Sequence, residues 1–267
     1  MSLLWRNHLR ISLCPDRLVL GSYSRGLRPS RARNETIAVQ PLANAEEWRA
    51  AVDALPKVLA AHPHHDFSVV VADQFVRYAL LPFNEALKSS DQWATLARHR
   101  LTAVHGAAAA EWDLKLTETA PMGARIACAV DRALIEELSA LFVAANARLV
   151  SVQPFLVAAF NRIRSTVGNG SCWLVIEEPG RSTLAYIQRG AWHAIRSRGT
   201  DGREPAPIAE MLERETAILG LDKPVTQVFM HSDIGADAST WGRYEVRDVT
   251  LASGAAVRDR KLAMAIG

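Results

Sequence analysis

Leu9-Arg-Ile-Ser-Leu-Cys-Pro-Asp-Arg-Leu-Val-Leu-Gly-Ser-Tyr23 is the stretch of the sequence that decides the fold. Its two apolar runs, 9–13 and 17–23, are typical of strands, and Cys14-Pro15-Asp16 between them is a hairpin turn signal. Three further segments follow. Residues 35–40 predict a strand, residues from about 45 to 59 an amphipathic helix, and residues 67–72 a strand buried on both faces. The helix carries its apolar residues at helical spacing, and Pro56 within it predicts a kink or a division.

The second half of the chain repeats this order of elements without repeating the sequence. Three strands are predicted there, at 172–177, 182–188 and 191–197. A helix at 207–219 and a further strand at 225–231 follow them. Pro207 opens the helix and Gly220 closes it, which is the usual asymmetry of helix ends. Two such units predict a duplicated two-lobe α/β fold.

A further module lies between the two repeats. It begins with a strand at 75–81 and a helix at about 91–104. Two strands at 112–117 and 124–130 follow, and then a helix at 131–145 that Asp131 caps. A strand at 148–152 and a helix from Pro154 follow, and Gly168-Asn169-Gly170 is a candidate hinge between lobes.

Composition and charge are those of an ordinary globular protein. The chain has 267 residues, of which 49% are hydrophobic and 22% charged, and its net charge is +3. It contains no apolar run of about 18 residues and no signal-peptide pattern at its start, so a cytoplasmic protein without a membrane span is expected. Cys14, Cys128 and Cys172 form no CxxC pair, which favours a reducing compartment over a disulfide or zinc framework.

Several stretches resemble one known family. The segments that carry the resemblance are Tyr78-Ala-Leu-Leu-Pro-Phe, Trp93-Ala-Thr-Leu-Ala-Arg-His-Arg-Leu, Glu111-Trp-Asp-Leu-Lys-Leu, Arg125 to Phe160, and the closing Ala263-Met-Ala-Ile-Gly267. In order and character they are similar to the actin-like proteins of type IV pilus and type II secretion inner-membrane platforms, typified by PilM and the cytoplasmic part of GspL.

That resemblance implies an actin-like, ribonuclease H-like duplicated fold of two lobes, with an α+β subdomain inserted in the first lobe. The implied bounds are 1–74 and 148–168 for the first lobe, 75–147 for the inserted subdomain and 169–267 for the second lobe.

Nucleotide-binding members of this superfamily need three loops, and all three are altered here. The first loop should read Asp-x-Gly, but Ser12 stands at the Asp position, Cys14 at the Gly position, and Pro15 lacks an N–H. In the second loop, Glu177 and Glu178 would repel a phosphate.

The third loop, usually Gly-Gly, reads His231-Ser232-Asp233, where side chains block a close approach of the nucleotide. We therefore expect no catalytic residues, no cofactor and no metal, and hence no enzyme activity.

Three other patterns have two interpretations each. His62-Pro63-His64-His65 could ligate a metal, but a polar loop before a strand is favoured because no Cys lies nearby. Glu177-Glu178 could form an acid/base pair, but solvated hairpin carboxylates are favoured because adjacent strand residues point to opposite faces. Seven arginines near the start could contact a membrane-anchored partner, but the interpretation as a solvated edge is favoured. They are Arg6, Arg10, Arg17, Arg25, Arg28, Arg31 and Arg33. Few aromatic residues accompany them, which disfavours nucleic acid.

By resemblance, the expected function is that of a scaffold. It would grip the N-terminal cytoplasmic peptide of a single-pass inner-membrane protein, similar to PilN, in a groove between the first lobe and the inserted subdomain. Residues 75–130 and the early hairpin would line that groove, and other platform or motor proteins are further candidate partners. The protein would be peripheral at the inner membrane through its partner. The alternatives are an ATPase or kinase relative of the same superfamily, and a GspL-like chain that continues beyond residue 267.

Overall fold

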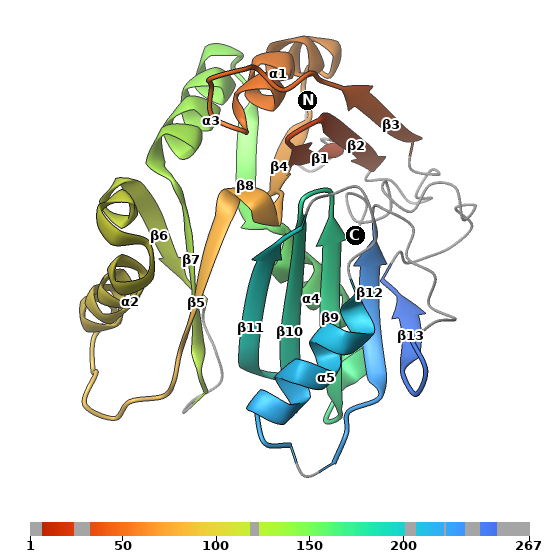
Figure 1. The fold of residues 1–267 in the computed structure, drawn as a ribbon. Coiled ribbons are helices and arrows are strands. Elements are labelled where there is room, and N and C mark those ends of the chain that lie inside the picture. The colour runs from red at the N-terminus through yellow and green to blue at the C-terminus, as the bar shows by residue number, and fades with distance from the viewer. Residues whose placement is uncertain are drawn as a thin grey trace. The chain divides into compact units, whose positions relative to one another are not determined.

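The computed structural model describes residues 7–23, 33–117, 123–200, 207–221, 223–232 and 241–249. These residues contain two five-stranded sheets and one three-stranded sheet (Figure 1). They form two compact units, one of residues 7–76 and 130–158 and the other of residues 77–129 and 159–249.

The first sheet has the strand order β3-β2-β1-β4-β8. The strands are β1 (His8–Cys14), β2 (Arg17–Tyr23), β3 (Arg33–Ala38), β4 (Asp66–Val71) and β8 (Arg148–Pro154). β1 pairs antiparallel with β2, and β2 with β3, whereas β1–β4 and β4–β8 are parallel. Every residue of β4 is buried, as its continuous apolar run predicted.

The second sheet repeats this arrangement in the order β11-β10-β9-β12-β13. The strands are β9 (Ser171–Glu178), β10 (Arg181–Gln188), β11 (Ala191–Gly199), β12 (Gln227–Ser232) and β13 (Glu245–Asp248). Two antiparallel pairings are again followed by two parallel ones. The predicted duplication is therefore confirmed, and β13 is a strand that the sequence analysis missed.

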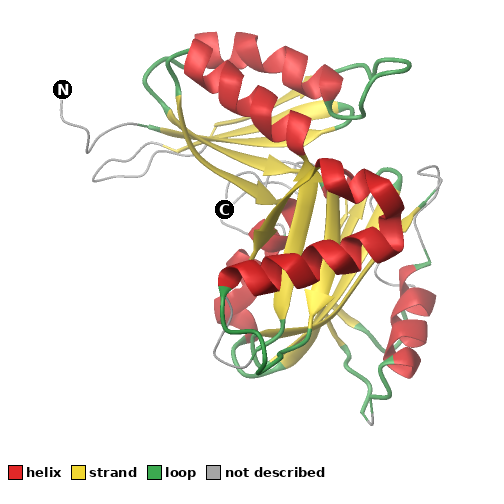
Figure 2. Cartoon of the chain, turned by 90° about the vertical axis from the view of Figure 1, so that its left-hand side faces the viewer, coloured by secondary structure: helices red, strands yellow, loops and turns green. Residues whose placement is uncertain are grey.

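Two helices cover the first sheet, α1 (Arg49–Ala61) and α3 (Arg132–Ala144), and they lie side by side on one face (Figure 2). Of the two expected effects of Pro56, the division of α1 is wrong, because one uninterrupted helix runs through it, and the kink stays a prediction. Asp131 caps α3 as predicted, since its carboxylate accepts from the backbone N–H of Ala133 at 2.9 Å.

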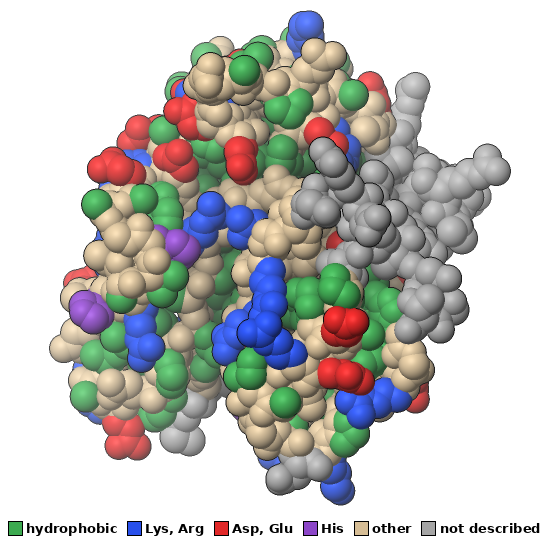
Figure 3. Space-filling model, viewed as in Figure 1, with side chains coloured by type: hydrophobic (Ala, Val, Ile, Leu, Met, Phe, Trp, Pro, Cys, Tyr) green, Lys and Arg blue, Asp and Glu red, His purple; other side chains and the backbone are tan. Residues whose placement is uncertain are grey.

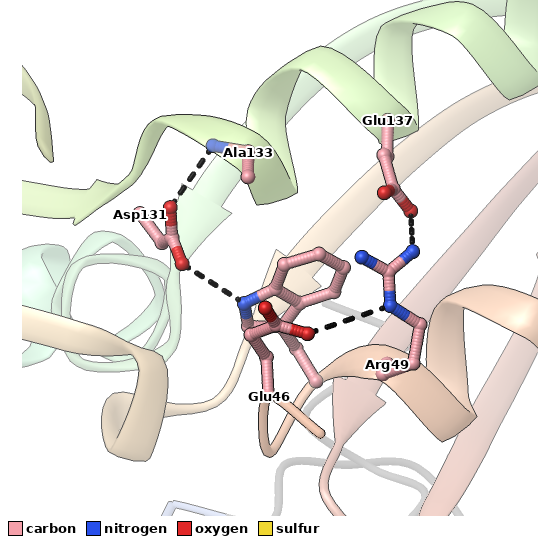
Figure 4. A network of polar contacts seen from close by, with 6 residues as sticks. Glu46, Arg49, Asp131, Ala133 and Glu137 are labelled. Carbon is pink, nitrogen blue, oxygen red and sulfur yellow. Dashed lines mark hydrogen bonds and ion pairs between the residues drawn. The ribbon is translucent and has the colours of Figure 1, made fainter. Parts of the chain in front are cut away.

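A polar network joins α1 to α3 (Figure 4). Arg49 donates to Glu137 on α3 and also lies 3.6 Å from the carboxylate of Glu46. Its guanidinium lies 4.4 Å from the centre of the Trp48 ring, and the Nε1–H of Trp48 donates to Asp131 at 3.4 Å. The two helices are thus joined by the Arg49–Glu137 ion pair and the Trp48–Asp131 hydrogen bond in addition to their apolar stripes.

The segment between β4 and α3 forms the third sheet, of order β5-β7-β6. It consists of η2 (Asp73–Phe75), β5 (Val76–Leu81), α2 (Ser90–His105), η3 (Gly106–Glu111), β6 (Trp112–Leu116) and β7 (Arg125–Asp131). A capping box of Ser89 and Gln92 begins α2, whose buried face is Trp93, Ala97 and Leu101. This is the expected inserted α+β module, and the exact bounds given for the three parts stay a prediction.

The second sheet lies between α4 (Phe155–Val167) and α5 (Ile208–Ile218), with α5 in front of it in Figure 1. Ile208 and Leu212 of α5 pack into a core with Trp173 and Val175 of β9. Helical spacing of apolar residues does not fully describe the buried face of α5, because Ile218 is 58% exposed while Glu215 is buried. Among the described residues, no helix combines the length and the apolar character needed to cross a membrane.

Candidate functional site at the turns of the two sheets

The turn between β1 and β2 is the first of the predicted nucleotide loops. Ser12 is buried within β1, opposite Val19 of β2 and Val70 of β4. Cys14 is the last residue of β1 and is also buried. Asp16 in the turn accepts from the Arg17 guanidinium at 2.6 Å. Ser12 and Cys14 therefore stand as buried strand residues beside a turn whose carboxylate is already paired.

The turn between β9 and β10 is the second predicted loop. Glu177 and Glu178 end β9, and Gly180 in the turn has φ +81°, a conformation that favours glycine. The expectation that both carboxylates are solvated is wrong, because Glu177 is 0% and Glu178 3% exposed. β9 is a central strand, with β10 on one side and β12 on the other, so its last residues lie inside the sheet and not at a free edge.

Glu177 belongs to a row of polar side chains across the sheet. It pairs in register with Ser182 of β10 and with Ser232 of β12, so the three side chains share one face. The hydroxyl of Ser232 donates to the Glu177 carboxylate at 2.5 Å. All three residues are buried. The row therefore brings one carboxyl group and two hydroxyl groups together on one face of the sheet.

The end of β12 begins the third predicted loop. His231 is buried and pairs in register with Ile176, so it lies on the face of the sheet opposite to Glu177 and Ser232. Asp233 and Gly235 lie outside the described residues. Of the predicted loop positions, the structure thus brings together Glu177 and Ser232, turns His231 away from them, and places Ser12 and Cys14 in the other sheet.

The sequence analysis missed an ion-pair cluster in which a buried glutamate of α5 meets two exposed arginine side chains of β11. Glu215 of α5 is 2% exposed and lies 3.2 Å from Arg196 and 3.6 Å from Arg198. Lys and Arg side chains gather over β10 and β11 on the face seen in Figure 3. Glu215 sits in the helical register of Ile208 and Leu212, which is the signal that could have identified it as a residue facing the sheet.

Asp73 is a second missed residue. It follows β4 directly, is fully buried, and accepts from the backbone N–H of Leu156 at 3.1 Å, in the first turn of α4. A carboxylate at a helix N-terminus compensates the unpaired N–H groups and the positive end of the helix dipole. Asp73 is therefore assigned a structural role in starting α4.

The histidine loop and the three cysteines are the next candidates from the sequence. His62 to His65 form the predicted loop between α1 and β4, and no group of three metal-ligating side chains occurs in the described part of the chain. The three cysteines are buried free thiols, and burial raises the pKa of Cys172 to about 12.

The early arginines are only partly described. Arg17 is 6% exposed and paired with Asp16, so the expected solvated edge is wrong for that residue. The others fall as follows: Arg10 lies in β1, the side chain of Arg33 is outside the described part, and Arg6, Arg25, Arg28 and Arg31 lie outside the described residues altogether. The closing segment 263–267, which carried part of the resemblance, lies outside them too.

Comparison with known proteins gives structural matches only. No protein-family model and no curated protein matches the sequence. A chain of the PilM–PilN type IV pilus biogenesis complex matches with a TM-score of 0.62 and 11% identity, over 85% of this chain and 81% of that one. The cytoplasmic domain of EpsL, an inner-membrane component of the type II secretion system of Vibrio cholerae, matches with a TM-score of 0.58 and 10% identity, over 97% and 92%.

A protein with an actin-like ATPase fold and unknown function from Bacteroides thetaiotaomicron also matches, with a TM-score of 0.59 and 12% identity, over 88% of this chain and 85% of the other. At these identities the likeness concerns the fold. The chain therefore has the actin-like fold, and structures from pilus and secretion machines are among those that share it.

Proposed function

We propose that this chain is a non-catalytic actin-like scaffold of a pilus-assembly or secretion machine, which binds a short cytoplasmic peptide of a PilN-like inner-membrane protein. The observation that carries the proposal is the match to a chain of the PilM–PilN complex and to the EpsL cytoplasmic domain over most of each length. The protein would act at the cytoplasmic face of the inner membrane, held there by its partner.

The residues at the turns support the non-catalytic part of the proposal. Pro15 and Pro179 remove a backbone donor from each hairpin turn, and Glu177 places a buried carboxylate beside the second turn. A nucleoside triphosphate needs backbone N–H groups and cations at these two turns instead. The changes affect both sheets, so one compensating residue would not restore a site.

The three-stranded sheet is where we place the peptide. Its order β5-β7-β6 leaves β5 and β6 as edge strands, each with one side not paired to another described strand. An extended peptide can add itself to such an edge through backbone hydrogen bonds while its alternate side chains enter pockets. Both edges fall within residues 75–130, the region that the sequence analysis selected.

Calorimetric titration tests the proposal. The probe is a synthetic peptide of the cytoplasmic N-terminus of the PilN-like protein from the same organism, and the control is its scrambled sequence. We expect a dissociation constant in the micromolar range for the native peptide alone, about −8 kcal/mol. Equal heats for both peptides, or none at hundreds of micromolar, about −5 kcal/mol, would contradict peptide binding.

A second titration with ATP and magnesium separates the scaffold from the ATPase or kinase alternative. We expect no binding heat. Low-micromolar, magnesium-dependent binding of ATP would contradict the non-catalytic assignment and favour the nucleotide-dependent relative.

A further inference from the structure

The strand β11 lies at one edge of the second sheet, next to β10. It has nine residues and is the longest strand in the described part of the chain. Its outer side is not paired to another described strand, so backbone N–H and C=O groups along it have no partner within the sheet. An edge of this kind is a template for a further strand unless its side chains prevent the pairing.

Two arginines mark this edge with positive charge. Arg196 and Arg198 are two residues apart in β11, so they lie on the same face of the sheet. Their side chains are 46% and 38% exposed, whereas the side chain of Glu215, which pairs with both, is only 3% exposed. Two guanidinium groups meet one carboxylate, so one positive charge remains, and the part of the cluster that solvent reaches is cationic (Figure 3).

The other charged residues of α5 do not cancel this charge. Glu213 lies 3.7 Å from Arg243, which is two residues before β13 and hence toward the opposite edge of the sheet. Glu210 lies more than one helical turn before Glu215, and Arg214 adds a cation. Glu215 is therefore the acid through which α5 meets β11.

The opposite face of β11 also has an arginine beside it. Ser197 points to that face, because it lies between the two arginines of the strand. The guanidinium of Arg181 on β10 donates to the Ser197 hydroxyl at 3.0 Å. Glu178 is the register partner of Arg181 on β9, and it is 3% exposed. A strand added at β11 would thus meet arginines on both faces, while the acids that accompany them are buried.

The guanidinium group of Arg196 is held in place by two contacts. Its Nε lies 3.2 Å from the Glu215 carboxylate, and a terminal N–H donates to the carbonyl oxygen of Ile195 at 3.0 Å. An arginine fixed in this way loses less conformational entropy when it binds a ligand. Charges that only protect an edge from pairing need no such fixing, and burying Glu215 costs free energy. The arrangement therefore favours recognition over simple protection of the edge.

We propose that the edge of β11 is a docking site for an acidic extended segment of a partner protein, which adds a strand to the second sheet. Residues two apart in a strand are separated by about 6.6 Å, so alternate carboxylates of the added strand can pair with Arg196 and Arg198. Backbone hydrogen bonds supply affinity, and the arginines select negative charge. The site is separate from the edges β5 and β6, where we place the PilN-like peptide.

The test uses the full chain and three short fluorescein-labelled peptides. The first alternates acidic and apolar residues, Thr-Glu-Val-Glu-Val-Glu-Thr, the second has the same composition rearranged as Thr-Glu-Glu-Glu-Val-Val-Thr, and the third has Lys in place of each Glu of the first. By fluorescence anisotropy we expect the alternating acidic peptide to bind about 3- to 10-fold more tightly than the rearranged one, and the lysine peptide not to bind. Backbone amide exchange in residues 191–199 should slow when the alternating peptide is bound.

Variants assign the binding to this edge. Arg196→Gln/Arg198→Gln/Glu215→Gln removes both cations together with the buried carboxylate, so no charge stays buried without a partner. It should weaken binding of the alternating peptide about 3- to 10-fold. The matched control is Arg247→Gln, which changes an exposed residue of β13 at the opposite edge and should leave the affinity unchanged. Both variants lower the net charge by one, and thermal unfolding verifies that both are folded.

Several results would overturn the proposal. They are equal binding of the alternating and rearranged peptides, native affinity in the triple variant, and peptide binding without slower exchange in residues 191–199. A dimer seen by sedimentation and lost in the triple variant, without peptide binding, would assign the edge to a second copy of this chain instead. The affinity for the PilN-like peptide should be the same in the triple variant as in the native chain, so failure of one proposal is distinguishable from failure of the other.

Discussion

At the scale of single residues, two buried carboxyl side chains are held by polar partners from other elements. Glu177 and Glu215 are both at most 2% exposed, yet each has a defined partner: Ser232 for the first, and Arg196 with Arg198 for the second. A buried carboxylate is tolerated only when it is paired, and losing one partner costs more than the pair itself contributes.

Glu215 is therefore sensitive to substitution. We expect Glu215→Gln to lower the free energy of unfolding by about 1–3 kcal/mol, because two arginines would lose their counter-charge beside the core. Chemical denaturation measures this change. Glu213→Gln is the control, since its ion pair to Arg243 is exposed and should contribute less than about 0.5 kcal/mol. Equal effects of the two changes would contradict the assigned role of Glu215.

Cys172 should be unreactive in the folded protein. Burial raises the pKa of its thiol to about 12, so only about one molecule in ten thousand carries the reactive thiolate near pH 8. We expect a disulfide reagent to label Cys172 only after denaturant is added, with a rate that rises as the pH is raised. Peptide mapping identifies the labelled site, and rapid labelling in native buffer would be inconsistent with the buried position.

At the scale of elements, the contact between α1 and α3 determines how the first sheet is covered. Asp131 serves both helices, because it caps α3 at Ala133 and accepts from Trp48 beside α1. We expect Asp131→Ala to destabilise the protein by about 1–2 kcal/mol. Asp131→Asn should recover most of that loss in thermal or chemical denaturation, since Asn is an equally good cap. If the two variants behaved alike, capping would not be the cause.

Replacement of Pro56 is expected to stabilise the protein, whereas replacement of Asp131 is expected to destabilise it. It lies in the interior of α1 and is exposed, so its ring fills no core space while it removes one helix hydrogen bond. We expect Pro56→Ala to raise the free energy of unfolding by about 1–3 kcal/mol, reduced in part by the greater freedom of the unfolded chain. A fall in stability, measured by urea titration, would mean that the ring makes a contact that outweighs the missing bond.

At the scale of the whole molecule, the same strand order is built twice from unlike sequences. The residues that we propose exclude a nucleotide are spread over both copies, with Pro15 in the first hairpin and Glu177, Glu178 and Pro179 in the second.

We therefore expect that no single reversion restores ATP binding. The melting temperature of Pro15→Gly, and that of Glu178→Ser, should stay unchanged by ATP and magnesium, because a ligand raises stability only when it binds the folded state. Differential scanning fluorimetry with and without nucleotide measures this. A nucleotide-dependent rise in either variant would show that one turn alone controls the site.

The local pattern of the sequence by itself determined where most of the described strands and helices lie, although it did not predict β13. The hairpin at Cys14-Pro15-Asp16, the buried run 67–72 and the cap at Asp131 all depend on neighbours within a few residues, so their conformations could be read directly. The repeat of strand order followed from the same signals.

Only the tertiary structure decided which polar residues are buried and which of them meet. Glu177 was expected to be solvated, but it is buried and bonded to Ser232 of the neighbouring strand β12. Glu215, for which the sequence predicted no role, lies beside two arginines of β11. The histidine loop, residues 62–65, lines a groove together with residues 141–148, because α3 packs beside α1. Burial and pairing depend on contacts between segments far apart in the chain, and local sequence patterns carry little information about those contacts.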